Sequence, residues 1–121
     1  MVYLEGPLGA GKTTLVRALL AARGYRGRVR SPTYTLVETY PGVVHLDLYR
    51  LADAEELEWV GLRDYLDGGT IMLAEWAEKG RGVLPPADLV VRLEPAGGGR
   101  RVTLTAVGAR GERILRCLVR I

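Results

Sequence analysis

The glycine-rich stretch GPLGAGKT at residues 6–13 constrains the fold of this chain more than any other feature. It matches the pattern G-x-x-x-x-G-K-[ST] in full. The glycines allow the backbone to curl so that successive N–H groups point at one place, where an anion can bind. Such a loop follows an apolar strand and leads directly into a helix, and residues 1–5 and 13–23 have these two patterns. The sequence therefore predicts a strand, a phosphate-binding loop and a helix.

The rest of the chain alternates between strand and helix patterns. Gly24 ends the first helix, and Pro41-Gly42 and Gly97–Gly99 are turn signals. Strands are predicted at 35–40, 43–49, 70–76, 89–95 and 100–107, a helix with Asp53 as its N-cap at 53–66, and, in an ambiguous segment, a terminal helix at 112–121. We expect residues 1–121 to form a single α/β domain of the P-loop NTPase type, with three layers, a mixed, largely parallel sheet and a C-terminal antiparallel hairpin.

Composition excludes several classes of protein. The 121 residues are 48% hydrophobic, which predicts a globular domain. The single cysteine, Cys117, cannot form an internal disulfide, and one cysteine with one histidine excludes the usual Cys/His zinc site. There is no secretory signal and no apolar run near the roughly 20 residues of a membrane helix, so we expect a cytoplasmic protein. The net charge of +3 does not by itself establish contact with nucleic acid.

The phosphate loop assigns roles to specific side chains. Lys12 would reach the β and γ phosphates of a nucleotide, and the Thr13 hydroxyl would be a ligand of Mg²⁺. The chain has one other lysine, Lys79, and a surface cation in so arginine-rich a sequence would be expected to be arginine. The alternative is a glycine-rich loop that binds nothing. The expected nucleotide-binding residues are Gly6, Leu8, Gly9, Ala10, Gly11, Lys12, Thr13 and Thr14.

Two acids are candidates for the second metal ligand. Asp47 in VVHLDLYR and Glu75 in TIMLAEW both follow apolar residues, as an acid at the end of a buried strand does. One would hold Mg²⁺ while the other positions or deprotonates the attacking water. The alternative for each is a carboxylate that caps a helix or pairs with an arginine. Pattern alone does not rank the two.

The type of nucleotide follows from what the sequence lacks. The chain contains no asparagine, so guanine recognition through an Asn-Lys-x-Asp motif is excluded and ATP is favoured. The hydroxyl-rich loop around Ser31-Pro32-Thr33 is placed where switch-type NTPases sense the γ phosphate, although a plain turn is an equal alternative. A small-molecule or nucleotide kinase is the alternative to a simple ATPase.

Six stretches occur together, in order: GPLGAGKTT, SPTYTLVETY, HLDLYRL, EELEWVGLRDYL, LAEW and LPPADL. As a set they resemble the bacterial TsaE (YjeE) ATPases, over nearly the whole chain. The resemblance implies a protein that acts in the threonylcarbamoyladenosine modification of tRNA, binding ATP and Mg²⁺ and a TsaB–TsaD heterodimer without transferring the group itself. Slow hydrolysis alone, stimulated by the partner, is expected. Direct contact with tRNA stays open.

The resemblance also implies residue roles. Thr13 and Glu75 are similar to the Mg²⁺ ligands of the family, and Asp47 to the carboxylate needed for hydrolysis. Lys12 and Thr33 are the further candidates for catalysis. Thr33 is similar to the switch residue of the family near the γ phosphate. For Trp76 we favour a partly exposed reporter or contact residue, against the alternative of a packed core residue.

Two departures from the family pattern are visible. Family members usually carry a further helix and strand before the phosphate loop, which here begins at residue 6. We therefore expect that segment to be missing. The two alternatives are a weaker affinity for the nucleotide and a natural start that is not residue 1. Pro7 stands where the family commonly has Asp, which removes one backbone donor.

Overall fold

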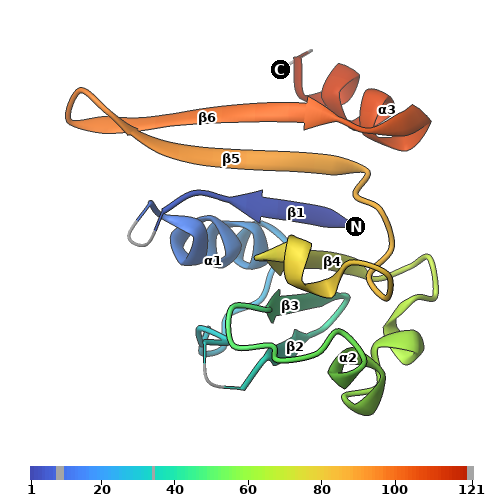
Figure 1. Cartoon of the computed structure of the whole chain (residues 1–121). Coiled ribbons are helices and arrows are strands. Elements are labelled where there is room, and N and C mark those ends of the chain that lie inside the picture. Colours follow the sequence, from blue (N-terminus) through green and yellow to red (C-terminus); the bar gives the residue numbers. More distant parts are fainter. Residues whose placement is uncertain (8–9, 34, 120–121) are drawn as a thin grey trace.

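The computed structural model describes residues 1–7, 10–33 and 35–119. Its centre is a six-stranded sheet with the strand order β2-β3-β4-β1-β5-β6. The strands are β1 (Val2–Glu5), β2 (Val37–Tyr40), β3 (Val43–Asp47), β4 (Ile71–Glu75), β5 (Leu89–Ala96) and β6 (Gly99–Ala106). The four inner strands pair in parallel, and the two outer strands pair antiparallel with their neighbours. The predicted mixed, largely parallel sheet is confirmed (Figure 1).

Both predicted turn signals are hairpin turns, although the sequence predicted a hairpin only for the second. Pro41-Gly42 joins β2 to β3, and Tyr40 pairs with Val43. Gly97 and Gly98 both adopt positive φ between β5 and β6, which is the backbone of a tight two-residue hairpin turn. The long β5–β6 hairpin forms one edge of the sheet in Figure 1, and the short β2 lies at the other.

Helices cover both faces of the sheet. One face packs on α1 (Lys12–Ala22) and on α3 (Gly108–Val119) through Val16, Leu20 and Ile114. The other face packs on α2 (Glu56–Trp59) and the 3₁₀ helix η1 (Leu62–Tyr65). A second 3₁₀ helix, η2 (Ala77–Gly80), follows β4. These are the three predicted layers. In the described part of the chain, no helix is long and apolar enough to cross a membrane.

The prediction of one continuous helix over 53–66 was wrong. Gly61 adopts φ 78° and separates α2 from η1. Leu57 and Leu62 are nevertheless both almost fully buried in the same cluster. In a regular helix, residues five apart point about 140° away from each other, so the break at Gly61 lets both leucines reach one core. Asp53 accepts the N–H of Glu55 instead of capping a long helix.

The terminal helix begins at Gly108 rather than at 112. Gly111 lies so close to the loop before β5 that a Cβ there would meet the carbonyl oxygen of Asp88 at 1.8 Å. Glycine inside a helix is locally unfavourable, and the sequence pattern therefore did not include it. The close approach brings α3 against the sheet face that α1 also covers.

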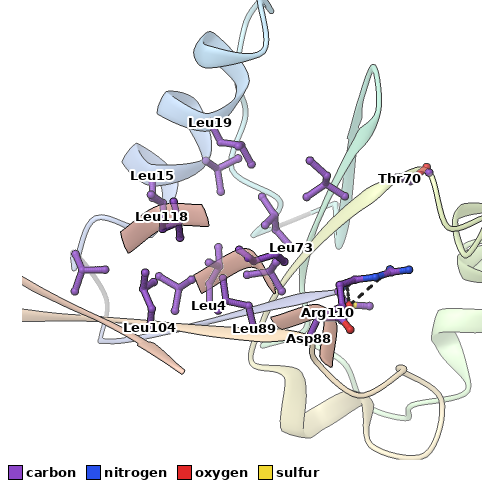
Figure 2. A pocket seen from close by; sticks show the side chains of 18 of the residues that line it. Leu4, Leu15, Leu19, Thr70, Leu73, Asp88, Leu89, Leu104, Arg110 and Leu118 are labelled. Atoms are coloured by element: carbon purple, nitrogen blue, oxygen red, sulfur yellow. Dashed lines mark hydrogen bonds and ion pairs between the residues drawn. The ribbon is translucent and has the colours of Figure 1, made fainter. Parts of the chain in front are cut away.

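A large apolar cavity remains between α1, α3 and this face of the sheet. Its volume is about 570 Å³. In Figure 2, Leu15 and Leu19 of α1 and Leu4, Leu73 and Leu89 of the strands surround it. Asp88 and Arg110 lie together at one end, 4.0 Å apart.

Candidate functional site

The carboxyl ends of three neighbouring strands meet beside α1. The chain leaves β1 at Glu5 and enters the phosphate loop, while Asp47 ends β3 and Glu75 ends β4. Asp47 is directly opposite Glu75 in the parallel register, and Glu75 is opposite Leu4 of β1. The two predicted acids therefore lie at adjacent strand ends next to the loop. This is the position at which open α/β sheets bind ligands.

The start and the end of the loop both require glycine. Gly6 has φ 143°, and a Cβ there would lie 2.4 Å from the carbonyl oxygen of Leu93 in β5. Gly11 has φ 104° and precedes the first helical residue. Between them, the N–H of Ala10 donates to the carbonyl of Pro7 at 3.1 Å. The predicted binding residues Leu8 and Gly9 lie outside the described residues.

The N-terminus of α1 opens toward the loop. The first helical bond runs from Leu15 N–H to the Gly11 carbonyl. The N–H groups of Lys12, Thr13 and Thr14 are those that a helix leaves without intrahelical acceptors. No acid stands in the first turn, and no side chain of the described residues caps it. The positive end of the helix dipole is therefore not neutralised from within, which favours an anion there.

Lys12 and Glu75 form a buried ion pair at the centre of the site. The Lys12 Nζ lies 3.3 Å from Oε1 of Glu75 and donates to the carbonyl of Gly6 at 2.8 Å. Lys12 is 8% exposed and Glu75 6%. Burial raises the pKa of Glu75, but the hydrogen bond and charge of His45, followed by those of Lys12, outweigh it and lower the pKa below its ordinary value. These contacts therefore favour the ionised form of the carboxylate, which is the form that can bind a cation.

Asp47 contacts the loop that follows α1. Its Oδ1 accepts the N–H of Tyr49 at 3.1 Å, and its Oδ2 accepts a long hydrogen bond, 3.5 Å, from the hydroxyl of Thr33. Thr33 also shares a hydrogen bond of 2.8 Å with Ser31. For this segment the sequence gives a plain turn as an equal alternative to a γ-phosphate sensor. In the structure the Thr33 hydroxyl contacts the strand-end acid Asp47, and the Ser31 hydroxyl contacts Thr33.

Trp76 lies beside the ion pair in a strained conformation. It has φ 57°, which is uncommon for a residue other than glycine. Its ring lies 5.7 Å from the Lys12 ammonium and 5.0 Å from the ring of Tyr49. Trp76 is partly buried, so it combines the two readings of the sequence: it packs on the core and also borders the site.

A small cleft opens next to these groups. Its volume is about 290 Å³, and Gly6, Lys12, Trp76 and Arg92 contribute to its walls. The larger apolar cavity reaches residues at the amino ends of the strands, such as Leu89 and Thr70, and is the less suitable place for a charged ligand. We assign the candidate site to the smaller cleft because the buried charges and the helix N-terminus are there.

The donor set fits a magnesium ion of the phosphate-loop type. Among the described residues, no three His, Cys, Asp or Glu side chains form a cluster that could hold a metal. Mg²⁺ needs no such cluster, because it keeps several waters and takes one or two protein oxygens together with phosphate oxygens. The ionised Glu75 and the Thr13 hydroxyl in the first turn of α1 would supply those oxygens.

Two contacts of the site had no signal in the sequence. The Nε2 of His45, a fully buried side chain of β3, lies 2.6 Å from Oε2 of Glu75. The Nε of Arg100, at the start of β6, donates to the carbonyl of Ala10 at 3.1 Å. His45 is 30 positions from Glu75, and Arg100 is 90 positions from Ala10, so only the folded sheet brings each pair together.

Comparison with known proteins agrees with this arrangement. The family model described as threonylcarbamoyl adenosine biosynthesis protein TsaE matches residues 1–102. The chain belongs to the TsaE family. The TsaE protein of Haemophilus influenzae is 51% identical over 119 residues, which is 95% of this chain and 75% of that protein. The TsaE protein of Bacillus subtilis is 40% identical over 119 residues, which is 94% of this chain and 74% of that protein.

A solved crystal structure has the same fold. The crystal structure of YdiB from Bacillus subtilis superimposes with a TM-score of 0.80 at 33% sequence identity, and the match covers 98% of this chain and 76% of YdiB. The α/β fold that the sequence predicted, with its mixed sheet and C-terminal hairpin, is thereby confirmed.

Proposed function

We propose that this chain binds and hydrolyses ATP, as a single P-loop ATPase domain, in support of the threonylcarbamoyladenosine modification of tRNA. The observation that carries the proposal is the buried pair of Lys12 and Glu75 at the N-terminus of α1. A buried ammonium beside free helix amides suits a phosphate chain, and a buried carboxylate 3.3 Å away suits the cation that accompanies it. Family membership supplies the tRNA modification as the process.

Each side chain has a role in this proposal. Lys12 leaves the Gly6 carbonyl and Glu75 to contact the β and γ phosphates, and the amides at the start of α1 hold the phosphate oxygens. Thr13 and Glu75 hold Mg²⁺, which neutralises charge on the phosphates. Asp47 orients the attacking water through the oxygen that Thr33 now contacts, while the Tyr49 N–H fixes its other oxygen. Thr33 then responds to the γ phosphate.

We propose that hydrolysis by the isolated chain is slow. Among the described residues that line the cleft, the cations are Lys12 and Arg92. Arg92 lies 3.2 Å from Glu94 and 3.8 Å from Glu5, so acids already offset much of its charge. A partner, which we take from the family to be a TsaB–TsaD heterodimer, would complete or reorder the site. The TsaE-type protein would act on tRNA through that complex.

A phosphate-release assay tests the proposal against its rivals. We expect slow release from ATP and Mg²⁺ alone and faster release when a TsaB–TsaD pair is added. Turnover that requires a hydroxyl-bearing small molecule, with the phosphate recovered on it, would instead identify a kinase. Tight ATP binding without turnover under either condition would identify a nucleotide-binding adaptor. Absence of any ATP binding by the chain would refute the site itself.

A further inference from the structure

His45 is a costly residue at its place in the fold. It stands in the middle of β3, where all five residues are buried, and its own side chain is 0% exposed. Its Nδ1 is buried and has no hydrogen-bond partner among the described residues. Burying a polar atom without a partner costs free energy, whereas an aliphatic side chain would fill this position without that cost. The imidazole therefore calls for a reason other than packing.

The register of the sheet aims this side chain at Glu75. His45 pairs with Leu73 of β4, and Glu75 stands two residues further along the same strand, so both side chains project from the same face. The imidazole Nε2 lies 2.6 Å from Oε2 of Glu75. An ionised carboxylate can only accept, so Nε2 is the donor. The other oxygen, Oε1, lies 3.3 Å from Lys12.

The two carboxylate oxygens thus have different partners. The terminal torsion of a glutamate side chain is broad, so the side chain alone does not fix the plane of its carboxylate. His45 holds one oxygen from inside the sheet and leaves the other facing the phosphate loop. Hydrogen bonds of this kind to a metal-binding carboxylate orient the ligand, and their loss typically lowers metal affinity 10–100-fold.

We propose that His45 is a positioning residue that holds Glu75 so that Oε1 is the oxygen offered to Mg²⁺. The inference rests on the proposed function, because it concerns the metal that accompanies ATP. It assigns His45 no contact with the nucleotide. Lys12 and the amides of α1 bind phosphate by themselves, so the effect of His45 is confined to the metal-dependent part of nucleotide binding.

Two amide substitutions separate the effect of a donor that reaches Glu75 from the effect of burying a polar side chain. In His45→Gln the side-chain N–H stands close to the place of Nε2 and can still donate to Glu75. In His45→Asn the amide is one carbon shorter and does not reach it. Both variants bury a neutral amide, so they carry similar costs for the fold. His45→Leu removes the donor without leaving a buried amide unpaired, and it replaces the Asn variant should that variant not fold.

The measurement is calorimetric titration with ATP at a series of Mg²⁺ concentrations and in EDTA. For His45→Asn or His45→Leu we expect the Mg²⁺ concentration at half-saturation to rise about tenfold or more. The affinity for metal-free ATP should change by less than about twofold. His45→Gln should stay within about threefold of the natural protein. Val43→Ala creates a cavity on the same face of β3, and it should lower the melting temperature and leave the Mg²⁺ requirement unchanged.

The outcomes distinguish the inference from the proposed function. If the natural protein binds ATP with Mg²⁺ and the Asn and Leu variants have the same Mg²⁺ requirement, His45 does not position Glu75 and the inference is overturned. Equal losses of ATP affinity with Mg²⁺ and in EDTA would also overturn the inference, because they would reflect general damage to the fold. If the natural protein shows no Mg²⁺-dependent binding of ATP, the proposed function fails and the inference fails with it.

Discussion

Two cavities of this molecule differ in what surrounds them more than in size. The larger, about 570 Å³, lies between α1, α3 and the sheet, and leucine and valine side chains form most of its wall. The smaller, about 290 Å³, lies at the carboxyl ends of the strands next to Lys12. The charged groups at the end of the larger cavity already pair with one another, since Asp88 binds both Arg110 and the amino group of Met1.

The comparison shows that volume alone does not locate chemistry in this fold. The smaller cleft adjoins a helix N-terminus, a buried ammonium and a buried carboxylate, and burying the two charged groups costs free energy. The larger cavity is lined by side chains whose burial stabilises the fold. We therefore expect changes at the cleft to act on ligand binding, and changes at the cavity to act on stability.

The largest effect is expected from Lys12→Ala. Removing the ammonium deletes a charge-assisted contact to phosphate, and ATP·Mg²⁺ should bind about 100-fold more weakly, or roughly 3 kcal/mol. Lys79→Ala is the matched control, because Lys79 is the other lysine and is exposed, donating to the carbonyl of Tyr49. Calorimetry checks both variants. If Lys12→Ala bound ATP·Mg²⁺ with unchanged affinity, the nucleotide would not bind in the cleft.

Leu89→Ala is expected to have a large effect on stability and almost none on ATP binding. Leu89 is 5% exposed, lines the apolar cavity and begins β5, at the other end of the strand from the phosphate loop. Truncation should cost about 2–4 kcal/mol and lower the melting temperature by roughly 10 °C. Below that temperature, the affinity for ATP should stay within about twofold. A folded variant that had lost ATP binding would show that the cavity takes part in the site.

The sequence predicted the cleft better than the cavity, because the cleft depends on local signals. The glycine spacing requires the loop, and an apolar run that ends in an acid identifies Asp47 and Glu75 as strand-end residues. Parallel strands then bring those ends together without further information. The structure has both acids at one edge of the sheet, opposite each other in the register, as this reasoning implies.

What the sequence did not reveal depends on long-range geometry. Nothing in VVHLD shows that His45 contacts Glu75, because the contact requires a particular register between β3 and β4. The break at Gly61 occurs because Leu57 and Leu62 must share one core. Gly111 stands inside α3 because the helix approaches Asp88 closely there. Local pattern cannot predict either of them, since tertiary packing overrides helix propensity there.

Tryptophan fluorescence can show directly which region a nucleotide occupies. Trp76 borders the cleft and contacts the Lys12 ammonium, whereas Trp59 of α2 is 89% exposed. We expect ATP·Mg²⁺ to change the emission of the natural protein. Trp59→Phe should retain nearly all of that change, and Trp76→Phe should lose it. A signal that followed Trp59 instead would place the response at α2 and contradict the assignment of the cleft.

The smallest effect is expected at Asp67, which fastens a turn that borders the apolar cavity. Its carboxylate accepts the N–H groups of Gly69 and Thr70 and the Thr70 hydroxyl, and Gly68, Gly69 and Thr70 line that cavity. The hydrogen bond from Gly69, followed by that from the Thr70 hydroxyl, lowers the pKa of Asp67 from its ordinary value of 3.8. Asp67→Ala should lower the melting temperature at pH 7 by only about 1–2 °C and leave ATP affinity unchanged.

The pH dependence of that small difference gives the sharper test. A carboxylate with a lowered pKa contributes stability that is fully present above its ordinary pKa and is lost as the pH falls through the folded-state value. The gap in melting temperature between the natural protein and Asp67→Ala should therefore stay constant from neutral pH down to about pH 5 and narrow below 3.8. Asp64→Ala, which removes an exposed acid of η1, serves as the control for net charge. A gap that widened in acid would mean that Asp67 stabilises the turn in its protonated form, and the wall of the apolar cavity would then depend on a different set of hydrogen bonds.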